Sequence, residues 1–131
     1  MPRPFSVTVL CAALAGLALY NGLGAAAAWD QRAFWAGLPL TVAPGYLLAR
    51  PALWAVAFTG LAAGLWRQWP RARLAVAAAW PVYLAWGWVE RLAWSPAGAS
   101  ALNWGWLLGA DVLSLAGVAY ALSRRPPQPA A

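Results

Sequence analysis

Several residue types that build chemical sites are scarce or missing from this 131-residue sequence. It has no histidine and no lysine, a single cysteine (Cys11), and only three acidic residues, which are Asp30, Glu90 and Asp111. Most metal, haem and catalytic-triad sites need several of these side chains. The chain alone therefore lacks the groups for such sites, and we expect neither an enzyme nor a bound metal or cofactor.

Charge is also scarce, and this scarcity indicates the solvent. Charged residues make up 9% of the chain and hydrophobic residues 63%, with a mean hydropathy of +0.59. Soluble globular proteins are about half apolar and about one quarter charged. So little polar surface cannot cover a folded sphere in water, so we expect an integral membrane protein. This length allows one domain with roughly four spans of about 20 residues.

Four apolar runs predict an all-α protein, a membrane-embedded four-helix bundle over residues 1–125. No alternation with a period of two interrupts these runs, which favours helices over a β-barrel. Pro51 suits the first turn of the second span, and Pro81 lies within the third. The proline-rich tail, residues 126–131, is predicted to be disordered. The expected spans are about 5–24, 51–67, 73–94 and 100–123.

Two segments allow alternative interpretations. The first apolar run could be a signal peptide, but its uncharged stretch exceeds the usual h-region of about 7–15 residues, which favours a retained helix. The segment between spans one and two could form a short interfacial helix with Trp29, Phe34 and Trp35 toward lipid, or an irregular loop.

The arginines predict an orientation. With a cytoplasmic N-terminus the inner side would hold six of the nine arginines, and the outer side would hold three together with two acids. The positive-inside rule therefore predicts that both termini are cytoplasmic, in a multi-pass protein of the bacterial inner membrane. Contact with anionic membrane lipid explains the basic character better than binding to nucleic acid does. The inner arginines are Arg3, Arg67, Arg71, Arg73, Arg124 and Arg125, and the outer charges are Arg32, Arg50, Arg91, Asp30 and Glu90.

Asp111 is the sharpest single signal. It lies 11 residues into a span that starts at residue 100, about 16 Å along a helix and so near the bilayer midplane. An ionised carboxylate is costly there, so Asp111 should face other helices and be paired or protonated. We expect a polar network of Asp111, Arg91 and Glu90, with Tyr83, Asn103 and Ser114 as neutral partners. The alternative is a site at Asp111 and Glu90 that handles protons or cations.

Tryptophans and glycines suggest contact surfaces. On the predicted topology, eight of the eleven tryptophans lie in or near the outer half, either as an aromatic belt or as a cleft for a lipid-like ligand. Trp80, Trp86, Trp94 and Trp104 form the candidate outer aromatic cluster. Two G-x-x-x-G pairs, Gly60 with Gly64 and Gly105 with Gly109, are candidates for close helix packing, first within the bundle and second between subunits.

The chain resembles an uncharacterised family of small bacterial four-helix membrane proteins, and this resemblance implies the architecture without an activity. From the residues we expect a structural or accessory subunit that packs with a larger membrane complex or with itself. A small proton- or cation-coupled transporter and a lipid- or isoprenoid-binding module are the alternatives. The matching segments are Arg3-Pro4-Phe5-Ser6-Val7-Thr8, Asn21, Gly64-Leu65-Trp66-Arg67, Glu90-Arg91-Leu92, Asn103-Trp104 and Ser123-Arg124.

Overall fold

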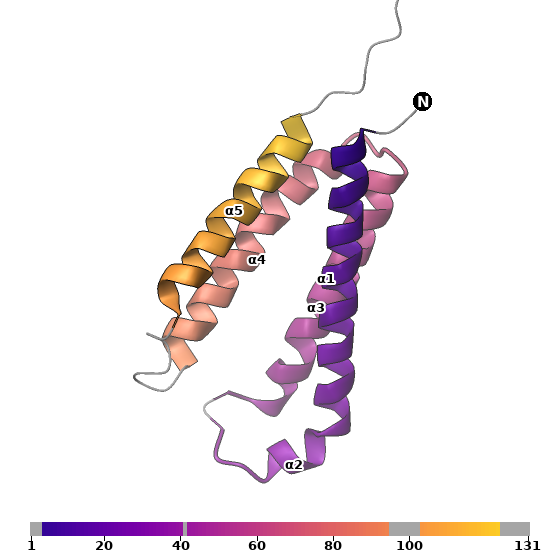
Figure 1. Cartoon of the computed structure of the whole chain (residues 1–131). Coiled ribbons are helices and arrows are strands. Elements are labelled where there is room, and N and C mark those ends of the chain that lie inside the picture. The colour runs from indigo at the N-terminus through magenta and orange to yellow at the C-terminus, as the bar shows by residue number, and fades with distance from the viewer. Residues whose placement is uncertain (1–3, 41, 95–102, 124–131) are drawn as a thin grey trace, which may run out of the picture. The chain divides into compact units, whose positions relative to one another are not determined.

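The computed structural model describes residues 4–40, 42–94 and 103–123. Every regular element within these ranges is a helix, which confirms the all-α prediction (Figure 1). Of the two alternatives for the segment between the first two long helices, the structure shows a short helix, α2. In chain order the helices are α1 (Phe5–Asp30), α2 (Arg32–Ala36), α3 (Pro44–Trp66), α4 (Ala72–Trp94) and α5 (Trp104–Ser123).

The chain forms two compact units. One is Cys11–Arg67, which contains most of α1 together with α2 and α3. The other contains the residues before Cys11 and those from Gln68 onward, and its main feature is the pair of helices α4 and α5.

The first two long helices are longer than the sequence predicted. Helix α1 continues through Ala25–Ala28 to Asp30, because alanine has the highest helix propensity and nothing there breaks the backbone. Helix α3 begins at Pro44, which takes the first-turn position where a missing N–H is harmless. The prediction that Pro51 occupies the first turn is therefore wrong, and both Arg50 and Pro51 lie inside α3.

The end of α3 is set by local backbone chemistry. Gln68 adopts a left-handed conformation with φ 57°, as residues just beyond a helix C-terminus commonly do. Pro70 follows two residues later and cannot continue the helix. Helix α4 then begins at Ala72, whose backbone N–H donates to the carbonyl of Trp69 at 3.0 Å.

Helices α1 and α3 approach each other through small residues. A Cβ added at Gly24 would lie 3.7 Å from the Cβ of Pro51, and one added at Gly22 would lie 4.0 Å from that of Ala55. The thiol of Cys11 lies 3.9 Å from the carbonyl oxygen of Ala62, within reach of a weak S–H hydrogen bond. Small side chains at these positions let the two helices approach each other.

Helices α4 and α5 run side by side in opposite directions (Figure 1). On α4 the buried side chains are Ala72, Val76 and Trp80, and on α5 they are Val118 and Ala121. Buried and half-buried positions on α5 follow a single stripe, so most of its circumference is exposed. A helix that is apolar all round yet mostly uncovered is suited to lipid rather than to water.

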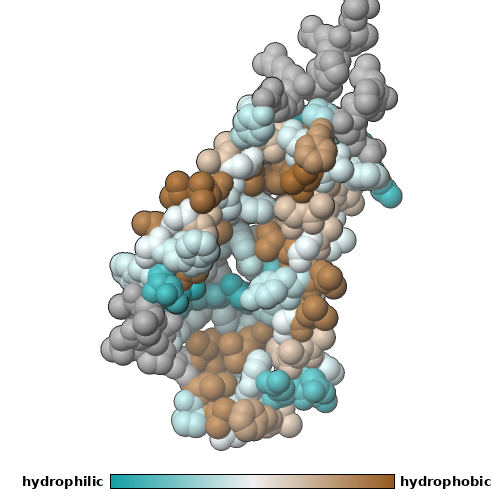
Figure 2. Space-filling view, in the orientation of Figure 1, coloured by the Kyte–Doolittle hydropathy of each residue, from teal (hydrophilic) through white to brown (hydrophobic). Residues whose placement is uncertain are grey.

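Three of the described helices, α1, α3 and α5, are long and apolar enough to cross a membrane. Helix α4 is less apolar, since it contains Arg73, Glu90 and Arg91. Figure 2 shows hydrophobic residues at the surface of the molecule, and Leu53, Leu113 and Trp106 are exposed by 67%, 74% and 79%. So many exposed large apolar side chains are typical of membrane proteins.

Candidate functional site

The polar side chains of α4 and α5 meet in one cluster, which we call the tryptophan–aspartate cluster. Helix α4 contributes Trp80, Trp88 and Arg91, and α5 contributes Asp111 and Ser114. Both helices belong to the same compact unit, so their contacts are defined within it.

The shortest contact in the cluster joins Trp88 to Asp111. The indole Nε1–H of Trp88 donates to Oδ2 of Asp111 at 2.7 Å. The acceptor is a carboxylate, and hydrogen bonds to an ionised partner are shorter and about twice as strong as neutral ones. Asp111 is half-buried, so this bond replaces solvation that the carboxylate loses between the helices.

Trp88 also contacts a cation and a second indole. The guanidinium carbon of Arg91 lies 5.7 Å from the centre of the Trp88 ring, within the range of a cation–π interaction. The ring of Trp104 meets that of Trp88 edge-on, with centroids 5.7 Å apart and an interplanar angle of 89°. An indole has a negative face and a positive N–H edge. The Trp88 indole therefore presents its face to the cation of Arg91 and its N–H to the anion of Asp111.

A second tryptophan joins the same two helices. The Nε1–H of Trp80 donates to the hydroxyl of Ser114 at 3.1 Å. That hydroxyl in turn donates to the backbone carbonyl of Asp111 at 2.8 Å, so donor and acceptor capacity are both used. Trp80 is only 8% exposed, and an indole buried this deeply needs a partner for its N–H.

A third contact closes the far end of the helix pair. Nη1 of Arg73, near the start of α4, donates to the carbonyl of Leu122 near the end of α5 at 3.1 Å. The last carbonyls of a helix have no partner within the helix. Arg73 satisfies one of them and places a positive charge where the helix dipole is negative. Polar contacts thus join α4 and α5 at three levels.

The structure changes the estimated depth of Asp111. Residues 100–102, where the fourth span was expected to start, lie outside the described residues, and α5 begins at Trp104. Asp111 is seven residues into this helix, about 10 Å from its start at a rise of about 1.5 Å per residue. In a helix of 20 residues this is about one third of the length rather than the middle.

The other predicted polar residues have separate roles. Oε1 of Glu90 accepts a hydrogen bond of 3.0 Å from Nε1–H of Trp86, one turn earlier on the same helix. Asn103 is exposed with φ 71°, and its backbone carbonyl accepts from Leu107 in the first turn of α5 at 2.9 Å. Tyr83 is half-buried on α4. The predicted network therefore has Trp88 between Arg91 and Asp111, while Asn103 contributes to the start of the helix.

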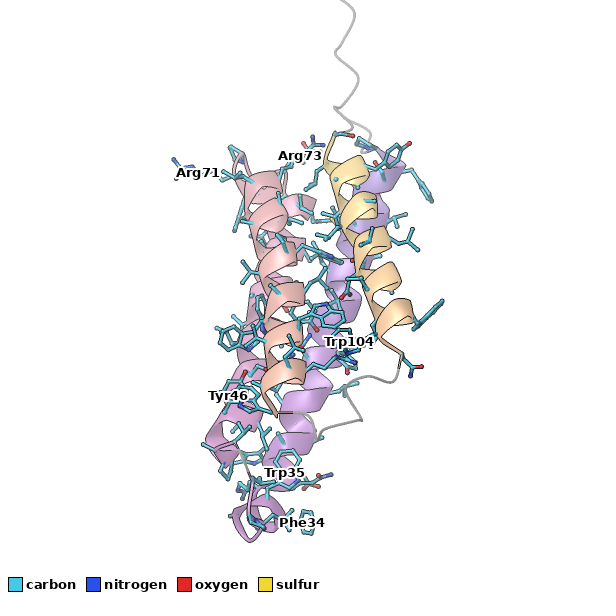
Figure 3. All side chains as sticks on the ribbon, turned by 90° about the vertical axis from the view of Figure 1, so that its left-hand side faces the viewer. Phe34, Trp35, Tyr46, Arg71, Arg73 and Trp104 are labelled. Atoms are coloured by element: carbon cyan, nitrogen blue, oxygen red, sulfur yellow. The ribbon has the colours of Figure 1, made fainter. Side chains whose placement is uncertain are left out.

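The four tryptophans of the predicted outer aromatic cluster do not all have the same surroundings. Trp80 and Trp104 belong to the helix contacts described above, whereas Trp86 is 40% exposed and Trp94 is 37% exposed. Figure 3 shows Trp104 near the first turn of α5. The four tryptophans thus occupy both buried and exposed positions.

The predicted packing glycines differ from one another. Gly64 is buried in α3. A Cβ added at Gly60, Gly105 or Gly109 would meet no heavy atom within 4 Å. By contrast, Gly22 and Gly24 on α1 lie close to α3, since an added Cβ would be 4.0 Å from that of Ala55 and 3.7 Å from that of Pro51.

Trp88 is the residue that the sequence reasoning missed. Counting 100° per residue places the Cα of Trp88 on a different face of α4 from Glu90. A helical wheel of this kind gives the direction of each Cα but not the length of the side chain. An indole is long and rigid, so its N–H reaches a partner that the Cα position does not indicate. One signal was available in the sequence. Trp88 lies three residues before Arg91, so on a helix the two side chains are neighbours.

Comparison of the chain with protein-family models, curated proteins and solved structures finds no match. The resemblance to small bacterial four-helix membrane proteins therefore stays a prediction, and function must be argued from the geometry alone.

Proposed function

We propose that this protein is a structural or accessory protein of the bacterial inner membrane, without catalytic chemistry of its own. The observation that carries the proposal is the hydrogen bond from Trp88 to Asp111. Through this bond Asp111, the acidic residue within α5, is joined to α4. A polar group that is satisfied inside a helix pair stabilises and orients that pair, and it is not positioned for turnover.

The proposed topology has four spans with both termini in the cytoplasm. Helix α4 is the uncertain span, because α1, α3 and α5 are apolar enough to cross a membrane by hydropathy and α4 is not among them. However, α4 contacts α5 from Arg73–Leu122 to Trp88–Asp111, and the two α4 residues are 15 positions apart, about 22 Å along the helix. A helix joined to α5 over that length must share the environment of α5. If α5 crosses the membrane, α4 therefore crosses it too.

The orientation can be tested with reporter fusions at the C-terminus. Four spans place the C-terminus on the side of the N-terminus, whereas three spans place it on the opposite side. We expect a C-terminal green fluorescent protein to be fluorescent and a C-terminal alkaline phosphatase to be inactive, as for a cytoplasmic end. The reverse result would contradict the proposed cytoplasmic C-terminus.

The exposed surface of α5 supports an interaction role. Gly105 and Gly109 are open, and Trp106 is 79% exposed beside them. Small residues allow a neighbouring helix to approach closely in lipid, where apolar burial alone gives no drive for association. We propose that this face contacts another membrane helix, either of a larger complex or of a second copy.

Native mass spectrometry after mild solubilisation tests the accessory role. A heteromeric complex that contains this chain supports it. A bare homodimer with proton or cation flux that depends on Asp111 would overturn it in favour of transport. A retained lipid-like mass bound one to one would instead favour a lipid- or isoprenoid-binding module.

A further inference from the structure

The end of the unit that contains the start of α4 has two arginines close together in the sequence. Arg71 and Arg73 flank the first residue of α4, and Trp69 precedes them. The sequence contains no acidic residue from Gln68 to Val89. We call Trp69, Arg71 and Arg73 the basic end of α4.

The two arginines of the basic end have different surroundings. Arg73 is half-buried and donates to the carbonyl of Leu122, which holds the ends of α4 and α5 together. Arg71 is exposed, and within the described residues its guanidinium has no hydrogen bond, ion pair or ring contact. Figure 3 shows its side chain directed away from the helices. Arg71 therefore presents all of its N–H donors outward.

The position of the basic end in a membrane follows from its neighbours. It lies at the end of α5, a helix long and apolar enough to cross the bilayer, so it is at the level of the lipid headgroups when α5 spans. Trp69 is 55% exposed there, and exposed tryptophans concentrate at this interface. The guanidinium fork matches the oxygens of a phosphate, which it binds through two parallel hydrogen bonds.

We propose that the basic end of α4 binds the phosphate headgroup of an anionic phospholipid, with Arg71 as the main contact and Arg73 as a secondary one. Arg73 fixes this site against the end of α5, and the Trp69 indole lies in the adjoining interface. A zwitterionic lipid has the same phosphate but adds a cation that Arg71 repels. The site thus distinguishes lipids by net charge. This inference does not depend on the accessory role proposed above.

The chain supplies a matched control for this proposal in Arg32. Arg32 is also exposed beside a tryptophan, but its Nη1 donates to the carbonyl of Trp29 at 2.7 Å and its guanidinium lies 4.2 Å from the centre of the Trp29 ring. Its donors are thus partly occupied by the protein. Arg32→Gln and Arg71→Gln remove the same charge from exposed positions, and only the second removes a guanidinium with no partner in the described part of the chain.

The experiment titrates purified protein in detergent with phosphatidylglycerol or with phosphatidylcholine of the same acyl chains, and counts bound lipids by native mass spectrometry. We expect the wild type to retain phosphatidylglycerol in preference. Arg71→Gln should weaken that binding about fivefold, the effect of one basic residue near an anionic surface, and Arg32→Gln should change it less than twofold. Added salt should weaken binding in the wild type more than in Arg71→Gln.

Two outcomes would overturn the inference. One is equal retention of the two lipids by the wild type. The other is an equal loss in the Arg32 and Arg71 variants, which would mean that net charge rather than the basic end recruits the lipid. Because the Arg71 guanidinium contacts none of the residues that the structure describes, its substitution should leave thermal stability unchanged, which separates lost binding from lost folding.

Discussion

Removal of the Trp88 indole N–H tests the central contact of α4 and α5. Trp88→Phe keeps an aromatic ring for Arg91 and Trp104 but deletes the donor to Asp111. Asp111→Leu deletes the acceptor and leaves a side chain suited to lipid. The two single variants and the double variant form a cycle that isolates the coupling between these positions.

The size of the coupling can be bounded from the geometry. In soluble proteins a hydrogen bond to a charged group contributes about 1.5–3 kcal/mol. Between membrane helices, side-chain hydrogen bonds average about 0.6 and reach about 1.7 kcal/mol, because the unfolded state in the membrane also finds partners. The distance is 2.7 Å and the carboxylate is half-buried, which places this bond near the upper membrane value. We expect a coupling of about 1.5 kcal/mol.

Steric trapping of the unfolded state measures this coupling. Biotin labels on cysteines at the exposed positions Leu74 and Ala119, in a Cys11→Ser background, would report separation of α4 from α5. A control cycle pairs Asp111→Leu with Trp106→Phe, since Trp106 lies on α5 but is 79% exposed. The control should give no coupling. A Trp88–Asp111 coupling below about 0.3 kcal/mol would refute the clamp, because that is within the error of additive sites.

The same contact gives an expectation for Asp111→Asn. The asparagine carbonyl can still accept from Trp88, but without charge assistance, which is worth about half of the bond. Asp111→Asn should therefore destabilise the helix pair by about half as much as Asp111→Leu does. If Asp111→Asn keeps wild-type stability and abolishes an ion or proton flux in proteoliposomes, transport becomes the better proposal.

Three further predictions follow from other contacts. Ser114→Ala leaves the buried N–H of Trp80 without its acceptor and should cost about 0.6–1.7 kcal/mol by steric trapping; no loss would mean that the Trp80 contact is dispensable. Gly24→Ala places a Cβ at 3.7 Å from that of Pro51, which is an ordinary contact. The better helix propensity of alanine should therefore stabilise the chain by about 0.5–1 kcal/mol in thermal unfolding. Destabilisation would show that α1 and α3 need the glycine itself. Cys11 is only 6% exposed, so its alkylation by N-ethylmaleimide should be at least tenfold slower in the folded protein than in denaturant, and equal rates would contradict the packing of α1 on α3.

The polar contacts have a common chemical character. In the described helix pair the indoles of Trp80, Trp86 and Trp88 each donate to an oxygen, and two of those oxygens belong to the acids Glu90 and Asp111. A tryptophan N–H can satisfy a carboxylate without adding a second charge that must itself be desolvated. This suits a chain with three acids and nine basic residues, all of them arginine, placed mainly near helix ends.

The sequence by itself determined the class of the protein, because composition acts on every residue at once. A charge content of 9% predicts a membrane protein rather than a water-soluble one, and long apolar runs with a helical backbone are the simplest way to satisfy backbone groups in lipid. The same reasoning left either a short helix or an irregular loop between the first two long helices, and it singled out Asp111 as a charged residue within an apolar span.

Only the tertiary structure decided which groups meet. The partner of Asp111 depends on the register of α4 against α5 and on the reach of an indole, and neither is encoded in hydropathy. The position of Pro51 depended on whether Pro44 started the helix first, since either proline suits a first turn. The local sequence pattern determines that a helix forms, whereas contacts between helices depend on side-chain length and register. The hydrogen bond from Trp88 to Asp111 depends on both and therefore does not follow from the pattern of either helix alone.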